Sequence, residues 1–83
     1  MADALDTGDL FFTVQVGAFA NKANAQKLAD ELSDKGFDAY VESFDKGITS
    51  LYRVRVGKFS SREEAEAVES RLSEQDYPTK IFP

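Results

Sequence analysis

The chain of 83 residues contains no cysteine and no histidine. The lack of cysteine excludes disulfides and thiol chemistry, and the lack of both removes ligands that zinc and other transition metals favour. We therefore expect no metal site and no cofactor. The sequence also has no apolar run long enough to cross a bilayer and nothing like a signal peptide, so we expect no direct membrane insertion. Any anchor or signal would lie outside this chain.

Residues suited to catalysis are scarce as well. Without histidine or cysteine, a nucleophilic serine would need another base, and no spacing in the sequence supplies one. Four glutamates cluster early in a predicted helix that follows Ser61, off its apolar stripe: Glu63, Glu64, Glu66 and Glu69. Such a cluster is a solvated face favoured by the helix dipole, not an acid/base pair. The sequence therefore predicts a protein that is not an enzyme and has no catalytic residues.

The net charge of −5 is unevenly distributed. The first ten residues contain Asp3, Asp6 and Asp9 and no base, and the rest of the chain has ten bases against twelve acids. We expect residues 1–10 to form a flexible acidic N-terminal tail or linker, and residues 11–83 to form one small domain. A domain with a slight excess of acid is a poor candidate for tracking nucleic-acid phosphates.

A repeat dominates the remaining residues. The segment FTVQVGAFAN at 12–21 returns forty residues later as YRVRVGKFSS at 52–61. Identical residues at this offset include Val14 and Val54, Val16 and Val56, Gly17 and Gly57, Phe19 and Phe59, and Leu32 and Leu72. Two copies are too few for a solenoid, so we expect them to complete one another in a single core.

Each copy predicts a strand, a helix and a second strand. Apolar and polar residues alternate over 11–16 and 52–56, which is typical of half-buried strands. Apolar stripes at helical spacing follow, with Asn21 as one N-cap, Ser61 and Glu64 as a capping box, and Gly36 ending the first helix. Further strands are predicted over 37–44 and 79–82, and Asp45-Lys46-Gly47 predicts a hairpin turn between the copies.

The resulting β-α-β-β-α-β order favours an α+β, ferredoxin-like (RNP-like) sandwich in which two helices cover one face of a four-stranded antiparallel sheet. If the repeated valines face the helices, Thr13, Gln15, Arg53 and Arg55 face away, joined by Tyr40 and Glu42 and, next in the alternation, Phe44. No third layer remains to cover them. The short last strand does not reveal which faces Ile81 and Phe82 occupy.

The two V-x-V-G-x-F phrases, each followed by a helix containing alanine, resemble the SPOR (sporulation-related repeat) domain family over residues 12–82. The resemblance implies the fold predicted above and the binding of bacterial peptidoglycan, in particular glycan strands stripped of their stem peptides, on the helix-free face. It also implies a place in the periplasm or cell envelope of a bacterium, within a larger exported or membrane-anchored protein. Septal proteins are further partners that it implies.

Residue by residue, the resemblance assigns Gln15, Arg53 and Ile81 to the glycan groove. Leu51 stands where many members have a larger, often aromatic, residue, and Ala18 stands where serine is frequent. If the ligand is the one that the resemblance implies, we expect Arg53 and Arg55 to bind the lactyl carboxylate that peptide removal leaves on muramic acid. Gln15 would pair with an acetamide or hydroxyl, while Leu51 and Tyr40 would pack on sugar rings.

Two alternatives remain at this point. RNA-binding domains of this topology place outward aromatic residues on the two central strands, whereas Phe12 and Tyr52 fall on the buried side here, so binding of nucleic acid is disfavoured. A protein-interaction or regulatory oligomerisation module of the same fold is the second alternative, which a gel-filtration mass would test.

Overall fold

The computed structural model describes residues 11–47 and 49–83. Its elements are β1 (Phe12–Phe19), α2 (Lys22–Asp34), β2 (Ala39–Lys46), β3 (Thr49–Phe59), α3 (Arg62–Glu74) and β4 (Lys80–Phe82). The predicted β-α-β-β-α-β order is confirmed. The predicted tail at 1–10 lies outside the described residues.

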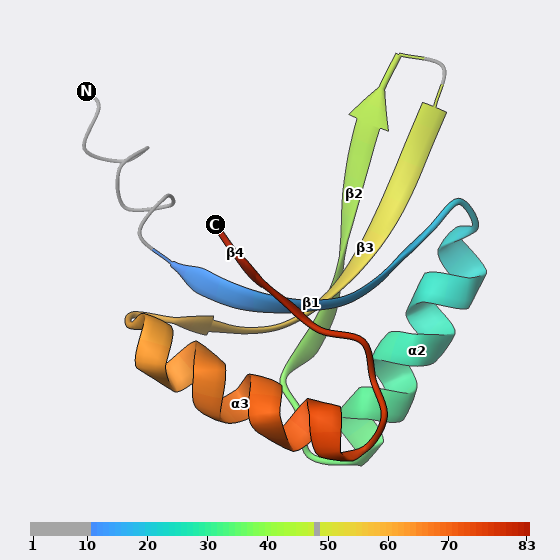
Figure 1. Ribbon diagram of the computed structural model, residues 1–83. Helices are drawn as coiled ribbons and strands as arrows, with labels where there is room; N and C mark the ends of the chain where they lie inside the picture. Colours follow the sequence, from blue (N-terminus) through green and yellow to red (C-terminus); the bar gives the residue numbers. More distant parts are fainter. Residues whose placement is uncertain (1–10, 48) are drawn as a thin grey trace, which may run out of the picture.

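The four strands form one antiparallel sheet in the order β2-β3-β1-β4, and both helices lie against the same side of it (Figure 1). The first strands of the two repeats, β1 and β3, are therefore neighbours at the centre of the sheet, as predicted. Within the described part of the chain, neither helix has the length and hydropathy needed to span a membrane.

The core consists of equivalent residues from the two repeats, packed between sheet and helices. Fully or almost fully buried pairs are Val14 with Val54, Val16 with Val56, Ala25 with Ala65, and Leu32 with Leu72. The alanines lie on the inner faces of α2 and α3, where a small side chain lets the helix backbone approach the sheet closely. Truncation of either leucine to alanine removes packing that is worth about 2–5 kcal/mol in comparable cores.

Each helix begins at a residue whose side chain caps its N-terminus. Asn21 accepts hydrogen bonds from the backbone N–H groups of Ala23 and Asn24, and Ser61 accepts one from Glu64. The Glu64 carboxylate accepts from the hydroxyls of Ser60 and Ser61, so only one half of the predicted capping box forms. This leaves the N-cap role of Ser61 intact.

At the helix ends, Gly36 has the predicted left-handed conformation, with φ of +92°. Asp76, the residue that corresponds to Gly36 in the second repeat, also has a positive φ of 69°. The backbone N–H of Phe37 donates to Leu32, and that of Tyr77 donates to Leu72, which completes the same C-terminal motif twice.

A polar cluster joins the C-terminal end of α2 to the segment after α3. The Tyr77 hydroxyl donates to the Glu31 carboxylate and accepts from Lys35 Nζ at 2.8 Å. This hydrogen bond from Lys35 to Tyr77, aided by the nearby Glu31 carboxylate, raises the pKa of the Lys35 ammonium group. The two repeats are therefore linked by polar contacts as well as through the core.

The repeated V-G-x-F phrase has a local structural cause. In each copy the phenylalanine ring lies over the glycine two residues before it, in the space that a side chain would need. A Cβ on Gly57 would lie 2.2 Å from the Phe59 ring, and one on Gly17 would lie 3.0 Å from the Phe19 ring. Gly57 also has φ of +73° and lies at a break in the β1–β3 register, as in a β-bulge that begins with glycine.

Boundaries differ from the prediction in all four strands. β3 runs from Thr49 to Phe59 instead of 52–56, and β2 continues to Lys46, so Asp45 and Lys46 belong to the strand and not to the hairpin turn. β1 continues to Phe19 because an irregularity between Gln15 and Gly17 interrupts the alternation without ending the pairing with β3. β2 begins at Ala39 because Phe37 follows directly on the helix end and packs in the core. β4 begins at Lys80, one residue later than expected.

We predict that Gly57→Ala is far more destabilising than Gly36→Ala. Both sites have positive φ, which costs an alanine about 1–2 kcal/mol, but only Gly57 has a ring where the new methyl group would lie. Displacing Phe59 adds roughly 1–3 kcal/mol from overpacking. Urea denaturation followed by circular dichroism measures both losses; equal losses would contradict the proposed role of the ring.

Candidate functional site on the open sheet face

The side of the sheet away from the helices, called the open face below, is defined by strand register. Arg55 is paired with Gln15 on β1 and with Tyr40 on β2, and Arg53 is paired with Ala18 and Glu42. Because the valines between these residues point into the core, the paired residues point the other way. The open face comprises Thr13, Gln15, Ala18, Tyr40, Glu42, Phe44, Leu51, Arg53, Arg55, Lys80 and Phe82.

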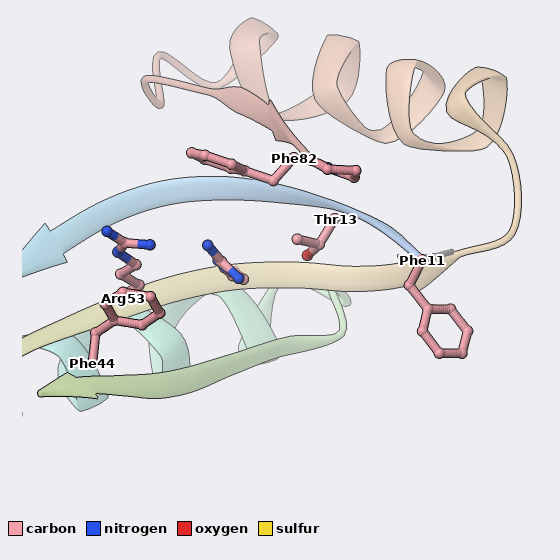
Figure 2. Close-up of a pocket in the computed structure, with 7 residues that line it drawn as sticks. Phe11, Thr13, Phe44, Arg53 and Phe82 are labelled. Carbon is pink, nitrogen blue, oxygen red and sulfur yellow. The ribbon is translucent and has the colours of Figure 1, made fainter. Parts of the chain in front are cut away.

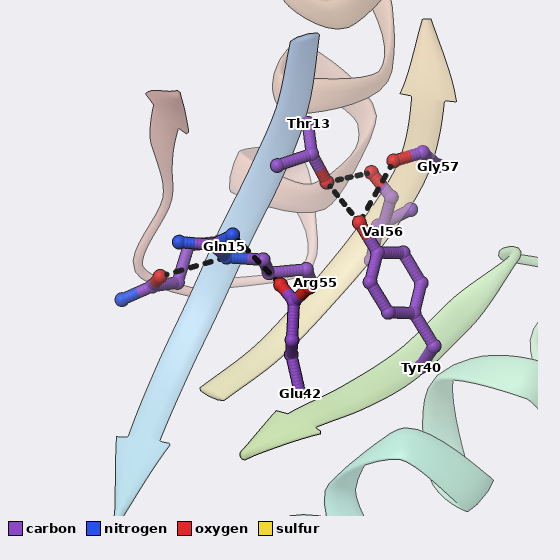
Figure 3. Close-up of polar contacts among 7 residues, drawn as sticks. All are labelled: Thr13, Gln15, Tyr40, Glu42, Arg55, Val56 and Gly57. Carbon is purple, nitrogen blue, oxygen red and sulfur yellow. Dashed lines mark hydrogen bonds and ion pairs between the residues drawn. The ribbon is translucent and has the colours of Figure 1, made fainter. Parts of the chain in front are cut away.

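Arg55 is held by neighbours on both sides (Figure 3). Its Nε donates to Gln15 Oε1 at 3.1 Å, and a terminal guanidinium nitrogen donates to Glu42 Oε1 at 2.9 Å. The Arg55 side chain is only 16% exposed, whereas that of Glu42 is 51% exposed. Arg55 thus has a compensating charge within the protein, and Gln15 keeps its amide NH2 to donate elsewhere.

Arg53 is in a different situation. Its register partner is Glu42, yet that carboxylate binds Arg55, and Arg53 lies against the ring of Phe44, with 4.1 Å between the guanidinium carbon and the ring centroid (Figure 2). The Arg53 Nε atom is buried and has no hydrogen-bond partner among the described residues. A buried donor without a partner is costly, so the Arg53 side chain would gain stability by turning to meet an acceptor that a ligand supplies.

A hollow of about 380 Å³ lies over these two arginines. Its lining includes Thr13, Phe11, Phe44 and Phe82 together with both guanidinium groups (Figure 2). Phe82 lies beside Arg55, with 5.0 Å from the guanidinium carbon to the ring centroid, as Phe44 lies beside Arg53. The hollow therefore offers guanidinium groups for an anion and aromatic faces for the apolar side of a sugar ring.

Tyr40 is fixed on the open face by a chain of hydrogen bonds (Figure 3). Its hydroxyl lies 3.0 Å from Thr13 Oγ1, and Thr13 donates to the backbone carbonyl of Val56 at 3.2 Å. In this arrangement Tyr40 donates to Thr13. The Tyr40 hydroxyl also lies 3.4 Å from the carbonyl of Gly57, so its single proton is shared between Thr13 and that carbonyl.

The structure brings most of the predicted site residues together, with one exception. Gln15, Ala18, Tyr40, Leu51, Arg53 and Arg55 all lie on the open face. Ile81 does not: it is paired with Val14 and packs against the hydrophobic core, so its assignment to the groove was wrong in geometry. Phe82, paired with Thr13, is the apolar residue that β4 places on the open face.

The sequence did not assign Phe11 or Phe82 to this surface, and it did not reveal that Glu42 binds Arg55. The alternation along β2 placed Glu42 and Phe44 outward but did not indicate which arginine each would contact. β4 has only three residues, too few for an alternating pattern to reveal that Phe82 faces outward. Phe11 directly precedes β1 and is 43% exposed; it stands two residues before Thr13, so the alternation over 11–16 could have placed it on this side of the sheet.

Basic side chains gather on this side of an otherwise acidic protein. Arg53, Arg55, Lys58 and Lys80 line the hollows of the open face, where Glu42 is the acidic lining residue. Across residues 11–47 and 49–83, no three acidic side chains are grouped so that they could hold a metal ion. The arrangement is thus suited to an anionic or polar ligand held by hydrogen bonds.

The chain belongs to the SPOR domain family, whose model matches residues 11–82. This confirms the family resemblance noted in the sequence, and the fold is the one that the resemblance implied. A search of curated proteins found no match.

Two solved structures are similar to this chain. One is the solution structure of the peptidoglycan binding domain of the B. subtilis cell wall lytic enzyme CwlC, with 36% identity, a TM-score of 0.74, and coverage of 87% of this chain and 86% of that one. The other is the crystal structure of the RlpA SPOR domain from Pseudomonas aeruginosa, with 26% identity, a TM-score of 0.73, and coverage of 87% and 97%.

We predict that Thr13→Val lowers the free energy of unfolding by about 1–2 kcal/mol, because it removes the hydrogen bond to the Tyr40 hydroxyl and the hydroxyl donor to the Val56 carbonyl. Tyr40→Phe removes the other hydroxyl of the pair. A double-mutant cycle of thermal or urea denaturation should show a coupling of about 1 kcal/mol between the two. Strictly additive losses would contradict the hydrogen-bond chain.

Proposed function

We propose that this domain binds bacterial peptidoglycan through its open face, and that it recognises glycan strands that lack stem peptides. The observation that carries the proposal is Arg53, a half-buried cation in the centre of the open face with a buried Nε atom that no described residue satisfies. Family membership supports it, as does likeness to a domain described as peptidoglycan binding at 36% identity.

The chemistry of a denuded strand matches the open face. Removal of the peptide leaves a free lactyl carboxylate on each muramic acid, and a guanidinium group binds a carboxylate through two parallel charge-assisted hydrogen bonds. Arg53 is the donor with capacity to spare. Gln15 offers its amide NH2 to an acetamide or hydroxyl, and Phe44 and Leu51, paired across β2 and β3, offer apolar surface to sugar rings.

Discrimination against intact strands follows from shape. An uninterrupted sheet surface accepts an extended polymer lying flat, but a peptide branching from every second sugar would hold the strand away from Arg53. Specificity would then arise from exclusion as much as from attraction. In this proposal the domain is a binding module, and it directs the protein that contains it to the cell wall or division septum, in the periplasm or cell envelope.

The proposal is tested by co-sedimentation of the domain with purified sacculi, untreated or digested beforehand with an amidase. We expect stronger pelleting after digestion, because digestion removes stem peptides and exposes carboxylates. Equal pelleting would contradict recognition of denuded strands. No pelleting from a folded sample would contradict peptidoglycan binding and favour the protein-interaction alternative, which the gel-filtration mass would then address.

In the same assay, Arg53→Ala should weaken binding to digested sacculi about ten- to hundredfold, the value of a charge-assisted hydrogen-bonded pair. Arg62→Ala is the matched control, since it removes the same charge from a 57% exposed side chain on α3, away from the open face. Both variants should keep the far-UV spectrum of the parent. Retained binding by a folded Arg53→Ala variant would remove Arg53 from the site.

A further inference from the structure

Glu42 distinguishes the two arginines of the open face. It is paired in register with Arg53, but its carboxylate binds Arg55 at 2.9 Å and leaves Arg53 stacked on Phe44. Arg55 has in addition a hydrogen bond to Gln15, so its guanidinium group is neutralised and oriented before any ligand arrives. Arg53 has neither an ion pair nor a partner for its buried Nε among the described residues.

We infer that Glu42 is a specificity-determining residue that limits the open face to one ligand carboxylate, held at Arg53, and reserves Arg55 and Gln15 for neutral groups. The inference rests on the proposed function in taking that carboxylate to be the lactyl group of muramic acid. Glu42 occupies the place at Arg55 that a second carboxylate would need. It also repels an anion approaching Arg53, because directly paired residues on neighbouring strands lie close together.

The geometry favours this role over a purely structural one. Glu42 is 51% exposed, and exposed ion pairs contribute little to stability, so the fold does not depend on this charge. Its position lies between two guanidinium groups at the centre of the ligand surface. In a polymer of alternating neutral and acidic sugars, a surface with one free and one neutralised guanidinium group would match one acidic sugar beside a neutral one.

The test uses two monosaccharides that differ only in the lactyl group, N-acetylmuramic acid and N-acetylglucosamine. Each is titrated into the domain while the Nε–H signals of the arginines are followed by NMR. We expect the acidic sugar to shift the Arg53 signal with little effect on Arg55, and we expect no comparable shift of Arg53 with the neutral sugar.

Glu42→Gln is the informative variant, because the amide keeps an oxygen that accepts from Arg55 and removes only the charge. It should bind N-acetylmuramic acid about three- to tenfold more tightly, with a steeper dependence on salt and a new response at Arg55. Glu66→Gln is the matched control: it makes the same change in net charge in an exposed i,i+4 pair on α3 and should leave binding unchanged.

The inference is overturned if Glu42→Gln binds no more tightly than the parent, or if Arg55 responds as strongly as Arg53 in the parent. It is also overturned if neither arginine responds to the acidic sugar. Sacculus pelleting then distinguishes the two proposals: pelleting without an arginine response leaves wall binding standing on other contacts. An arginine response without pelleting leaves the carboxylate site standing and removes the proposed function.

Discussion

Burial of four valines beneath two helices determines what the opposite side of the sheet displays. Val14, Val16, Val54 and Val56 are each at most 3% exposed, and they are supplied by the two central strands. Because side chains alternate along a strand, burying these residues forces Arg53 and Arg55 to the other side, in the middle of a surface that no further layer covers. The open face is thus a consequence of the core, and a slip of one residue in register would disrupt both.

Each copy of the repeat contributes the same set of structural features. Each copy places a valine pair inward, closes a phenylalanine ring over a glycine and starts a helix at the next turn of the chain. The two copies differ at outward-facing positions of the central strands, for example Gln15 in the first and Arg55 in the second. Gln15 in the first copy is paired with Arg55 in the second, so an amide and a guanidinium group lie side by side instead of two like charges.

The features that depend on periodicity were predictable from the sequence. Alternation in the central strands identified the buried and open faces, and helical spacing with capping residues located both helices. The last strand was not predictable, because three residues do not establish a pattern, and Phe82 takes the place on the open face that the resemblance assigned to Ile81. The sequence also could not predict that Glu42 binds Arg55 instead of its register partner Arg53, because this contact depends on side-chain conformations and not on register.

The proposed binding of a glycan strand to the open face is what the remaining interpretation depends on. It is tested most directly by mapping backbone amide shifts of the domain during titration with denuded glycan fragments. We expect the largest shifts in β1, β2 and β3 around Gln15, Glu42 and Arg53, with α2 and α3 nearly unaffected. Large shifts confined to the helices would contradict it.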